Sequence, residues 1–527
     1  DDGRKFFTLQ FLQKYVKLLS YYKMNDFQIH LSDNGSKKYF GDNWDSTYSA
    51  FRLENDTYHG LTAKDGSYTK KEFIDLQQLA DEYGIQIVPE IDVPAHSLAF
   101  SKAIPAIGSK KYGMDHLDLN DPLTDTVVRN VFKEYLSGPH PVFTGEVVDI
   151  GTDEYAKPAT EEFRAFTDML IKYVESFGKR VRLWGALTWA KGKTPVTVKG
   201  VTMNLWYNGY ANPIDMKKLG YKLISTPDGW LYIVPAAGYY YDYLNLRMIY
   251  DKWSPSLVGN VAFCAGDPSI MGGSFAEWND IVGNGISEKD VNDRVFPAIQ
   301  VLAQKMWGGT NTSMSYKDFA IQCKHIGEGP GLNIRGKLGN PDHPLVADFH
   351  FNKKSKNVRL KNASYAKGIK GKALSFLGES SYAVLPYKEI GYNYTVSFWI
   401  NPASGNPDNT VLFQSPNAVV KLNQGATGKL GFSRDGYNFK FNYTLPDNVW
   451  THIVISGTNK GTALFVNGHV QDSLYHHWVH FSKKNKRRKV ETLFFPLEKV
   501  GGFKGKIDEL EIWNIALSME AIKDMKE

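Results

Sequence analysis

The stretch KKEFIDLQQLADEYGIQIVPE, residues 70–90, predicts a helix that is followed at once by a short strand. In residues 70–83 the apolar side chains recur every three or four positions, which is the spacing of one buried helix face. Residues 85–89 form a compact β-branched run, and the carboxylate of Glu90 comes directly after it. A helix joined to a strand in this way is one unit of an α/β fold with a parallel sheet.

The same alternation of helix and strand extends to both sides of this unit. Residues 9–22 have helical periodicity and precede a strand candidate at 27–31. Five more strand candidates follow, at residues 147–150, 182–184, 202–206, 223–226 and 274–278. Seven strands within about 280 residues fit a (β/α)8 TIM-like barrel better than an open sheet. Because only residues 1–7 precede the first helix, the first barrel strand is expected to be truncated or only partly present.

A change of residue pattern marks a second domain. Residues 324–344 are rich in Gly, Pro and Asn, which predicts a linker. Beyond this segment the apolar residues alternate with period two, and Asn467-Gly468 has the composition of a hairpin turn. Strands joined by turns, without helices between them, indicate a β-sandwich. The sequence therefore predicts a barrel over residues 1–323, a linker over 324–344 and an all-β sandwich over 345–527.

Composition and charge exclude several classes of protein. The 527 residues carry a formal net charge of +6, which is small for this length and does not predict a nucleic-acid partner. No apolar run approaches the roughly 20 residues that a membrane-spanning helix needs, so no membrane span is expected. Two cysteines, Cys264 and Cys323, exclude a disulfide framework and a multi-cysteine metal cluster. The chain begins at Asp1 without a methionine or a signal peptide, which is expected of a mature protein or an excised fragment.

Two adjacent carboxylates follow the strand candidate at residues 147–150. In VDIGTDEY, residues 148–155, the strand stops at Gly151 and is followed by Asp153 and Glu154. Glycine permits the turn that brings both side chains into one site. Two close carboxyls resist ionising together, so one keeps a proton near neutral pH and can act as an acid in glycoside cleavage. The alternative is a helix N-terminus, where two acids are favoured by the helix dipole.

Polar and aromatic residues cluster at the other predicted strand ends as well. The cluster comprises His30, Asp33, Glu90, Asp92, Asp153, Glu154, Trp184, Trp206, Trp278 and Asp280. Barrel enzymes build their active sites from the carboxyl ends of the strands. The clustering therefore favours the catalytic interpretation of the acidic pair over the helix-capping one.

Three ordered motifs carry a family resemblance: PEIDVPAH at residues 89–96, DIGTDE at 149–154 and AEWND at 276–280. Over roughly residues 1–310 the chain resembles glycoside hydrolase family 20, which holds the β-N-acetylhexosaminidases and the lacto-N-biosidases. The resemblance implies a retaining, substrate-assisted mechanism, in which the substrate's own 2-acetamido oxygen attacks the anomeric carbon and forms an oxazolinium ion. It implies that Glu154 protonates the leaving oxygen and later deprotonates water, whereas Asp153 holds the acetamido nitrogen. This mechanism needs no metal or organic cofactor, and a structural calcium ion in the C-terminal domain has no sequence signal.

The resemblance also implies roles for four polar residues around this pair. Arg4 and Asp280 resemble residues that bind hydroxyls of the terminal sugar. Arg4 also fits a solvated arginine at a chain terminus. Asp33 and His96 resemble a supporting pair near the acid/base, and a purely structural histidine is the alternative.

The aromatic residues of the motifs are expected to enclose the sugar. Trp184, Trp206 and Trp278 resemble the walls around the acetamido methyl group and the sugar face. Each also fits a core tryptophan. Tyr232 resembles the tyrosine that donates a hydrogen bond to the acetamido oxygen, and Tyr240 or Tyr241 is the alternative.

The C-terminal segment resembles a concanavalin A-like (laminin-G-like) sandwich. The match is carried by VSFWI at residues 396–400, WTHIV at 450–454, LFVNG at 464–468 and GFKGKIDEL at 502–510. This fold binds carbohydrate in some proteins and is a structural companion in others, so a glycan or cell-wall contact is one alternative. The basic run KKNKRRK, residues 483–489, predicts a solvated loop, with an anionic glycan or cell-wall contact as the weaker alternative.

The leading interpretation is an exo-acting β-N-acetylhexosaminidase whose partner is a glycan with a terminal β-linked N-acetylhexosamine. Within the family, the alternative is a lacto-N-biosidase, which releases Gal-β1,3-GlcNAc and needs room for a second sugar. A non-catalytic glycan-binding protein on a degenerate barrel is the alternative from another class. The resemblance implies an extracellular or cell-surface location.

Overall fold

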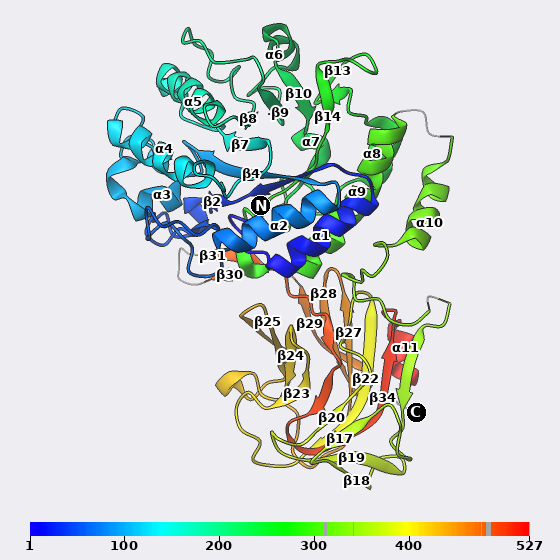
Figure 1. Cartoon of the computed structure of the whole chain (residues 1–527). Helices are drawn as coiled ribbons and strands as arrows, with labels where there is room; N and C mark the ends of the chain where they lie inside the picture. Colours follow the sequence, from blue (N-terminus) through cyan, green and yellow to red (C-terminus); the bar gives the residue numbers. More distant parts are fainter. Residues whose placement is uncertain (310–312, 341, 476, 481–485, 526–527) are drawn as a thin grey trace. The chain divides into compact units, whose positions relative to one another are not determined.

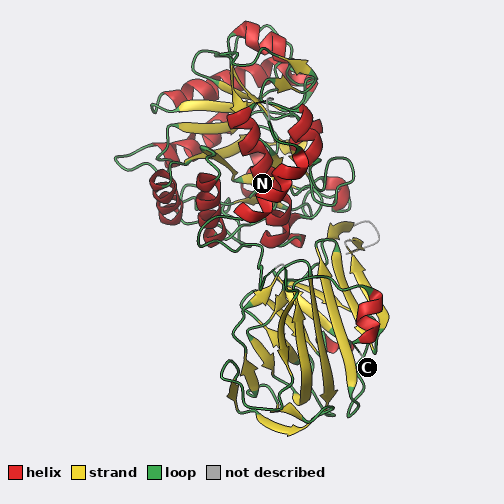
Figure 2. Cartoon of the chain, turned by 90° about the vertical axis from the view of Figure 1, so that its right-hand side faces the viewer, coloured by secondary structure: helices red, strands yellow, loops and turns green. Residues whose placement is uncertain are grey.

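The computed structural model describes residues 1–309, 313–340, 342–475, 477–480 and 486–525 (Figure 1). These residues belong to two compact units. The first consists of Asp1–Asn284, Arg294–Leu332 and Val479–Arg487, and the second of Gly285–Asp293, Asn333–Trp478 and Arg488–Glu527. Figure 2 shows helices and strands mixed within the first unit and mainly strands within the second. No described helix combines the length and the apolar character that crossing a membrane requires.

A curled sheet of seven parallel strands forms the centre of the first unit, in the order β1-β4-β7-β8-β9-β10-β14 (Figure 1). The strands are β1 (Asp26–His30), β4 (Gln86–Val93), β7 (Val147–Gly151), β8 (Arg180–Trp184), β9 (Thr202–Leu205), β10 (Lys222–Ser225) and β14 (Ile270–Gly273). The helices are α1 (Leu9–Tyr21), α2 (Lys70–Glu82), α3 (Leu98–Ala103), α4 (Pro122–Leu136), α5 (Thr160–Glu175), α6 (Pro213–Leu219), α7 (Asp228–Leu231), α8 (Leu246–Lys252), α9 (Glu288–Gly308) and α10 (Tyr316–Ile326). The predicted alternation of helices with parallel strands is confirmed.

Helix α2 begins where the sequence supplies both halves of a capping box. The hydroxyl of Thr69 accepts a hydrogen bond from the Glu72 N–H at 3.1 Å, and the Glu72 carboxylate accepts one from the Thr69 N–H at 2.8 Å. Two N–H groups that the helix leaves free are thereby satisfied. The buried face of α2 carries Phe73, Leu76 and Ala80, which confirms the period read from the sequence.

The last strand of the sheet differs from the prediction. The strand expected at residues 274–278 is replaced in the sheet by β14, which pairs with β10 and ends at Gly273. The short strand β15 (Ala276–Glu277) pairs instead with β11 (Tyr232–Ile233), outside the main sheet. Glycine is depleted in strands. Because β14 contains the pair Gly272-Gly273, residue propensities do not predict this strand. The structure explains Gly273, because a Cβ there would lie 2.7 Å from both Met306 Cε and Trp253 Cη2.

The start of the chain holds no strand between Asp1 and Thr8. The sheet has seven described strands, and β1 and β14 are its two edges. The Gly3 N–H donates to the His30 carbonyl at 2.9 Å, which places the segment before α1 at the carboxyl end of β1. A Cβ on Gly3 would lie 2.5 Å from the Asp33 nitrogen, so only glycine permits this approach. The expectation of an incomplete first strand agrees with these described residues.

The second unit consists of two large antiparallel sheets. One has the order β18-β19-β34-β22-β27-β28-β29, with β16 paired to β34, and the other has the order β17-β20-β33-β23-β24-β25-β26. The strands of the first sheet are β16 (Leu345–Phe349), β18 (Ser364–Lys367), β19 (Lys372–Leu377), β22 (Tyr394–Pro402), β27 (Thr451–Thr458), β28 (Gly461–Val466), β29 (His469–Tyr475) and β34 (Lys504–Trp513). Those of the second are β17 (Arg359–Lys361), β20 (Tyr382–Val384), β23 (Val411–Gln414), β24 (Ala418–Lys421), β25 (Gly431–Arg434), β26 (Tyr437–Lys440) and β33 (Lys499–Gly501). Apolar side chains of both sheets share one core, which includes Phe398, Phe413 and Ile455 and confirms the sandwich.

The structure can be compared with two further predictions, the linker and the loop at the basic run. Helix α10 ends at Ile326 and β16 begins at Leu345, and the described residues between them contain neither a helix nor a strand. The domain limits at 323 and 345 stay predictions. Of the basic run, residues 483–485 lie outside the described residues, whereas Lys486–Lys489 form strand β31 rather than the expected loop.

Candidate active site

The carboxyl ends of the parallel strands bring the predicted polar residues together. His30 at the end of β1 lies opposite Glu90 of β4, which in turn lies opposite Asp149 of β7. All three residues are buried, with 0–4 % of their surface exposed. The clustering that the sequence predicted for these strand ends is therefore present.

A tight turn after β7 presents the acidic pair. Gly151, Thr152 and Glu154 all have positive φ values, of 68°, 62° and 42°. A Cβ on Gly151 would lie 1.8 Å from Asp92 Oδ1, so glycine is required both by the backbone and by the carboxylate packed against it. The turn that the sequence assigned to Gly151 is confirmed, and the residues after it form no helix until η3 (Lys157–Ala159).

A chain of hydrogen bonds connects the base of the site with Glu154. His30 contacts Glu90 Oε1 through Nδ1 at 2.8 Å and Asp33 Oδ2 through Nε2 at 2.7 Å. The other oxygen of Asp33 lies 3.0 Å from His96 Nδ1, and His96 Nε2 lies 3.2 Å from Glu154 Oε2. The structure thus places Asp33 and His96 directly behind Glu154, where a supporting pair was expected.

The two acids of the pair differ in environment. The Asp153 side chain is 15 % exposed, and burial raises its pKa to about 7; His96 opposes this shift and Glu154 adds to it. The Glu154 side chain is 44 % exposed. Its burial would raise the pKa of this carboxyl, but the hydrogen bond from His96 and the charges of His96 and Arg4 together outweigh burial and lower the pKa. Without a ligand, the pair therefore holds its shared proton on Asp153 rather than on Glu154.

His30 and His96 are the positive charges that balance this acidic site. Burial alone would lower the pKa of His30, but two carboxylates, Glu90 foremost, raise it to about 10. Burial likewise opposes the charge of His96, and Asp33 more than compensates, so that the pKa of His96 lies well above its ordinary value. Both imidazoles are accordingly charged at neutral pH.

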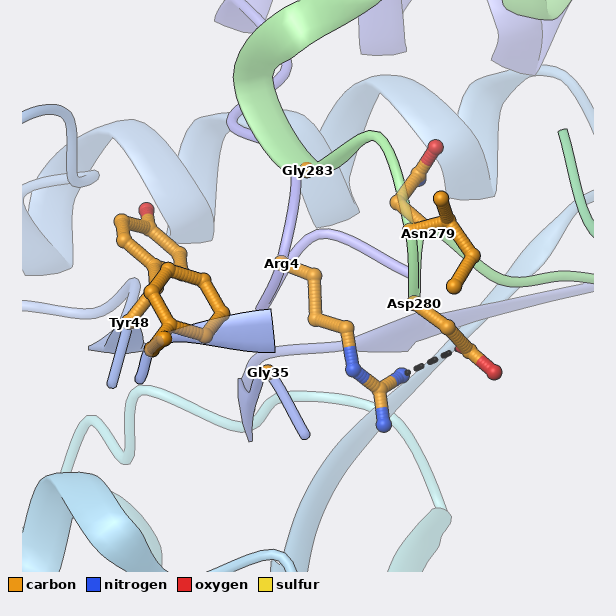
Figure 3. Close-up of a pocket in the computed structure, with 8 residues that line it drawn as sticks. Arg4, Gly35, Tyr48, Asn279, Asp280 and Gly283 are labelled. Carbon is orange, nitrogen blue, oxygen red and sulfur yellow. Dashed lines mark ion pairs between the residues drawn. The ribbon is translucent and has the colours of Figure 1, made fainter. Parts of the chain in front are cut away.

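Arg4 is buried in the site, which excludes a solvated terminal arginine. It is 8 % exposed, and Nη1 lies 2.8 Å from Asp33 Oδ2 and 3.4 Å from Asp280 Oδ1. Figure 3 shows the guanidinium turned toward Asp280. Asp1 Oδ2 also contacts Nη1, at 3.0 Å, and accepts a hydrogen bond from the Asn279 N–H at 2.7 Å. The segment before α1 and the loop after β15 therefore position Arg4 and Asp280 together.

Aromatic side chains form a box at the same end of the sheet. Trp184, Trp206 and Tyr232 belong to one buried cluster, against which Tyr240 and Trp278 pack with part of their surface exposed. The rings of Trp206 and Tyr232 are stacked, with centroids 6.3 Å apart and planes 7° apart. After burial, the charge of Asp153 is the largest cause that raises the pKa of Tyr232, so the box adjoins the acidic pair.

Some polar atoms of the aromatic box have hydrogen-bond partners among the described residues, and others have none. Trp184 Nε1 donates to Glu90 Oε1 at 2.8 Å, and Trp206 Nε1 donates to the Gly185 carbonyl at 3.2 Å. The indole N–H of Trp278 and Oδ1 of Asp153 are buried without a hydrogen-bond partner among the described residues. A donor and an acceptor therefore remain for a ligand, which an ordinary tryptophan core does not provide.

The alternatives for the tyrosine position occupy different places. The Tyr240 hydroxyl donates to Asp228 Oδ2 at 2.8 Å, and Tyr241 accepts a hydrogen bond from the Val234 N–H through its carbonyl. Only Tyr232 of the three belongs to the buried cluster itself. The geometry therefore favours Tyr232 as the residue that faces a ligand.

Two contributors were not assigned from the sequence. Asp1 anchors Arg4, and the Tyr239 hydroxyl donates to Asp280 Oδ2 at 2.9 Å. The run of tyrosines at 239–241 drew attention only to its later members. Both contacts join segments far apart in the chain, and no local pattern reveals such pairs.

The chain is similar to known glycoside hydrolases and to concanavalin A-like domains. The model of the glycosyl hydrolase family 20 catalytic domain matches residues 1–310, and a concanavalin A-like lectin/glucanase superfamily model matches residues 377–523. A lacto-N-biosidase of Bifidobacterium bifidum is 22 % identical over 289 residues, which are 49 % of this chain and 25 % of that protein. A β-N-acetylhexosaminidase of Cellulomonas fimi is 24 % identical over 58 % of this chain and 62 % of its own length.

A solved structure shares the fold. The β-N-acetylhexosaminidase of Bacteroides fragilis has a TM-score of 0.50 and 21 % identity, and the match covers 62 % of this chain and 68 % of that one. The chain spans less than two thirds of the length of the two curated relatives named above. Because the family model matches more than half of the 527 residues, the chain belongs to glycosyl hydrolase family 20 through its catalytic domain.

Proposed function

We propose that the chain is an exo-acting glycoside hydrolase that removes β-linked N-acetylhexosamine from glycans by substrate-assisted catalysis. The observation that carries this proposal is the position of Asp153. Its Oδ1 is buried without a hydrogen-bond partner among the described residues, next to the aromatic box, while Glu154 is 44 % exposed. One acid is thus buried beside the aromatic box, and the other is partly exposed to solvent.

The proposed mechanism divides the work between these two acids. The box of Trp184, Trp206 and Tyr232 encloses the acetamido group and excludes water from it. Asp153 Oδ1 accepts a hydrogen bond from the acetamido N–H and stabilises the positive charge of the oxazolinium ion. Tyr232 donates to the acetamido oxygen and aims it at the anomeric carbon.

Glu154 moves the proton in both steps. Its exposed carboxyl protonates the glycosidic oxygen as the bond to the anomeric carbon breaks, and the carboxylate then takes a proton from the water that opens the oxazolinium ion. The proton that the free pair holds on Asp153 must therefore pass to Glu154 when the substrate binds. The acetamido N–H favours this transfer because it needs an ionised Asp153 as its acceptor.

The pair formed by Arg4 and Asp280 supports exo action. Arg4 donates toward ring hydroxyls of the terminal sugar, and Asp280, held by Arg4 and Tyr239, accepts from them. Charged groups with buried partners bind hydroxyls without further ordering, which favours a fixed terminal sugar.

A lacto-N-biosidase is the second candidate, and a relative of that activity favours it. Arg4 and Asp280 help to line a small pocket with a volume of about 10 Å³ (Figure 3). The pocket is lined by Arg4, Gly35, Phe40, Tyr48, Asn279, Asp280, Ile281 and Gly283. This pocket has room for about one water molecule and not for a second sugar, so this candidate rests on the relative that is a lacto-N-biosidase.

Two substrates separate these candidates. Hydrolysis of p-nitrophenyl N-acetylglucosaminide supports the hexosaminidase, whereas hydrolysis of p-nitrophenyl lacto-N-bioside alone supports the lacto-N-biosidase. If neither is cleaved, and Glu154→Gln behaves like the unaltered chain on natural glycans, the chain is a glycan-binding protein. Chain dialysed against EDTA is expected to keep its activity, because no step of the mechanism uses a metal.

The cellular location of the chain and the role of its sandwich domain are also part of this proposal. We infer an extracellular or cell-surface location from the family, and a glycan or cell-wall contact for the sandwich. Binding of the isolated polysaccharides to the full chain, with Glu154→Gln to prevent turnover, tests the second of these.

A further inference from the structure

Three side chains beside the acidic pair are arranged as ligands for a cation. One atom each of Asp92, His96 and Asp153 lies within 4.8 Å of the others, and His96 Nε2 is 3.7 Å from Asp153 Oδ1. Ligand atoms about 2 Å from a tetrahedral zinc ion lie roughly 3.3 Å from one another, which is close to this distance between His96 and Asp153. The set of one imidazole and two carboxylates suits zinc or copper better than magnesium or calcium.

The two carboxylates of this set lack hydrogen-bond donors. Oδ1 of Asp92 and Oδ1 of Asp153 are both buried without a partner among the described residues. Asp92 is 2 % exposed, and its Oδ1 would lie 1.8 Å from a Cβ on Gly151. A buried carboxylate oxygen without a hydrogen bond is costly, and a bound cation would offset that cost.

The histidine is held in the orientation that a metal ligand needs. Asp33 Oδ1 lies 3.0 Å from His96 Nδ1, and Asp33 is itself held by Arg4 at 2.8 Å. A carboxylate behind one ring nitrogen fixes the imidazole so that its other nitrogen faces the ion. Here the other nitrogen, Nε2, lies 3.7 Å from Asp153 Oδ1 and 3.2 Å from Glu154 Oε2.

We propose that the chain binds one zinc ion through Asp92, His96 and Asp153, and that the bound ion inhibits hydrolysis. The ion occupies Asp153 Oδ1 and His96 Nε2. The inhibition rests on the proposed function, which assigns that oxygen of Asp153 to the acetamido group. Zinc and substrate then compete for one place, and no step of hydrolysis uses the metal.

Calorimetric titration of zinc into EDTA-dialysed chain tests the site without reference to activity. One zinc per chain is expected, with an affinity reduced about 10–100-fold or more in Asp92→Asn. The matched control is Asp115→Asn, which removes a carboxylate 2.9 Å from His116 and is expected to leave the affinity unchanged. An absence of binding at millimolar zinc, or equal affinity in Asp92→Asn, overturns the site.

A second measurement covers the case in which Asp92→Asn does not fold. The oxazoline mimic N-acetylglucosamine-thiazoline occupies the same place in the unaltered chain, so saturation with it is expected to abolish zinc binding. Zinc binding that is unaffected by bound thiazoline overturns the assignment.

Steady-state kinetics test the competition. Zinc is expected to raise KM, to leave kcat unchanged and to lose its effect when EDTA is added. Inhibition that lowers kcat at saturating substrate overturns the overlap. A different result would contradict the proposed function alone. If the chain binds zinc in the Asp92-dependent manner but neither hydrolyses glycosides nor binds thiazoline, the metal site is supported and the enzymatic function is not.

Discussion

His96 Nε2 lies 3.2 Å from Glu154 Oε2, and this contact determines where the acidic pair keeps its proton. The imidazole is charged and its other nitrogen is fixed by Asp33 at 3.0 Å, so it stabilises Glu154 as a carboxylate. Asp153, which is more deeply buried, has its pKa raised to about 7 and holds the proton instead. Transfer of this proton from Asp153 to Glu154 would therefore convert the free site into the form that the proposed mechanism uses.

The pH dependence of kcat/KM is expected to be bell-shaped with its alkaline limb near pH 7. Burial raises the pKa of Asp153 to about 7, so the pair loses its last proton above that pH and Glu154 can no longer act as an acid. At low pH, below the lowered pKa of Glu154, a second proton neutralises both carboxyls. The two limbs belong to the pair rather than to either residue. A value of kcat/KM that keeps rising well above pH 7 would contradict this picture.

Replacement of the histidine tests the cause of this profile. In His96→Gln the hydrogen bond and the charge that lower the pKa of Glu154 are lost, and so is the charge that opposes the raised pKa of Asp153. Both limbs of kcat/KM are therefore expected to move to higher pH. His116→Gln, which alters another histidine paired with an aspartate, is the control and should leave the profile in place.

Glu154→Gln is expected to lower kcat/KM on natural glycans by about 10²–10⁴-fold, the usual contribution of a general acid. The loss should be smaller on a p-nitrophenyl glycoside, because nitrophenolate leaves without protonation. Initial rates on both kinds of substrate measure the difference. Glu162→Gln, which changes an exposed acid in the first turn of α5, should behave like the unaltered chain. Full activity of Glu154→Gln on every glycoside would remove this residue from the mechanism.

Gly151→Ala is expected to destabilise the chain more than an ordinary glycine replacement. The new Cβ would lie 1.8 Å from Asp92 Oδ1, and such overpacking costs about 1–3 kcal/mol in the free energy of unfolding. Gly84→Ala is the matched control, because Gly84 has nearly the same φ, 69° against 68°, with nothing within 4 Å of its Cβ position. Denaturant unfolding of both variants separates the clash from the backbone strain, and equal losses of stability would show that Asp92 does not require the glycine.

The sequence predicted those parts of the molecule that depend on local pattern. Strands β4 and β7 are buried and rich in β-branched residues, and helix α2 carries its capping box and apolar face in order, so the sequence pattern identifies these elements. Strand β14 was misplaced because Gly272-Gly273 has no side chain from which to read a period. Gly273 is required because Trp253 and Met306 occupy the space beside it, and this is visible only in three dimensions.

The site was predictable to the extent that its residues lie in contiguous motifs. Asp153, Glu154 and His96 belong to such motifs, so the sequence alone identifies them as candidates. The anchoring of Arg4 by Asp1 and of Asp280 by Tyr239 depends on loops that meet only in the folded chain. The direction of the pKa shifts of Asp153 and Glu154 depends on burial and on His96. The motifs alone therefore do not predict which of the two acids binds the proton.

The central claim is that the substrate's own acetamido oxygen is the nucleophile and that Asp153 and Glu154 serve it. The most direct measurement is kcat/KM on a series of p-nitrophenyl glycosides in which the N-acetyl group carries none, one, two or three fluorine atoms, built on whichever glycoside the chain cleaves. Each fluorine withdraws electrons from the carbonyl oxygen, so kcat/KM is predicted to fall steeply along the series. A flat series would show that another nucleophile attacks the anomeric carbon and would contradict the mechanism.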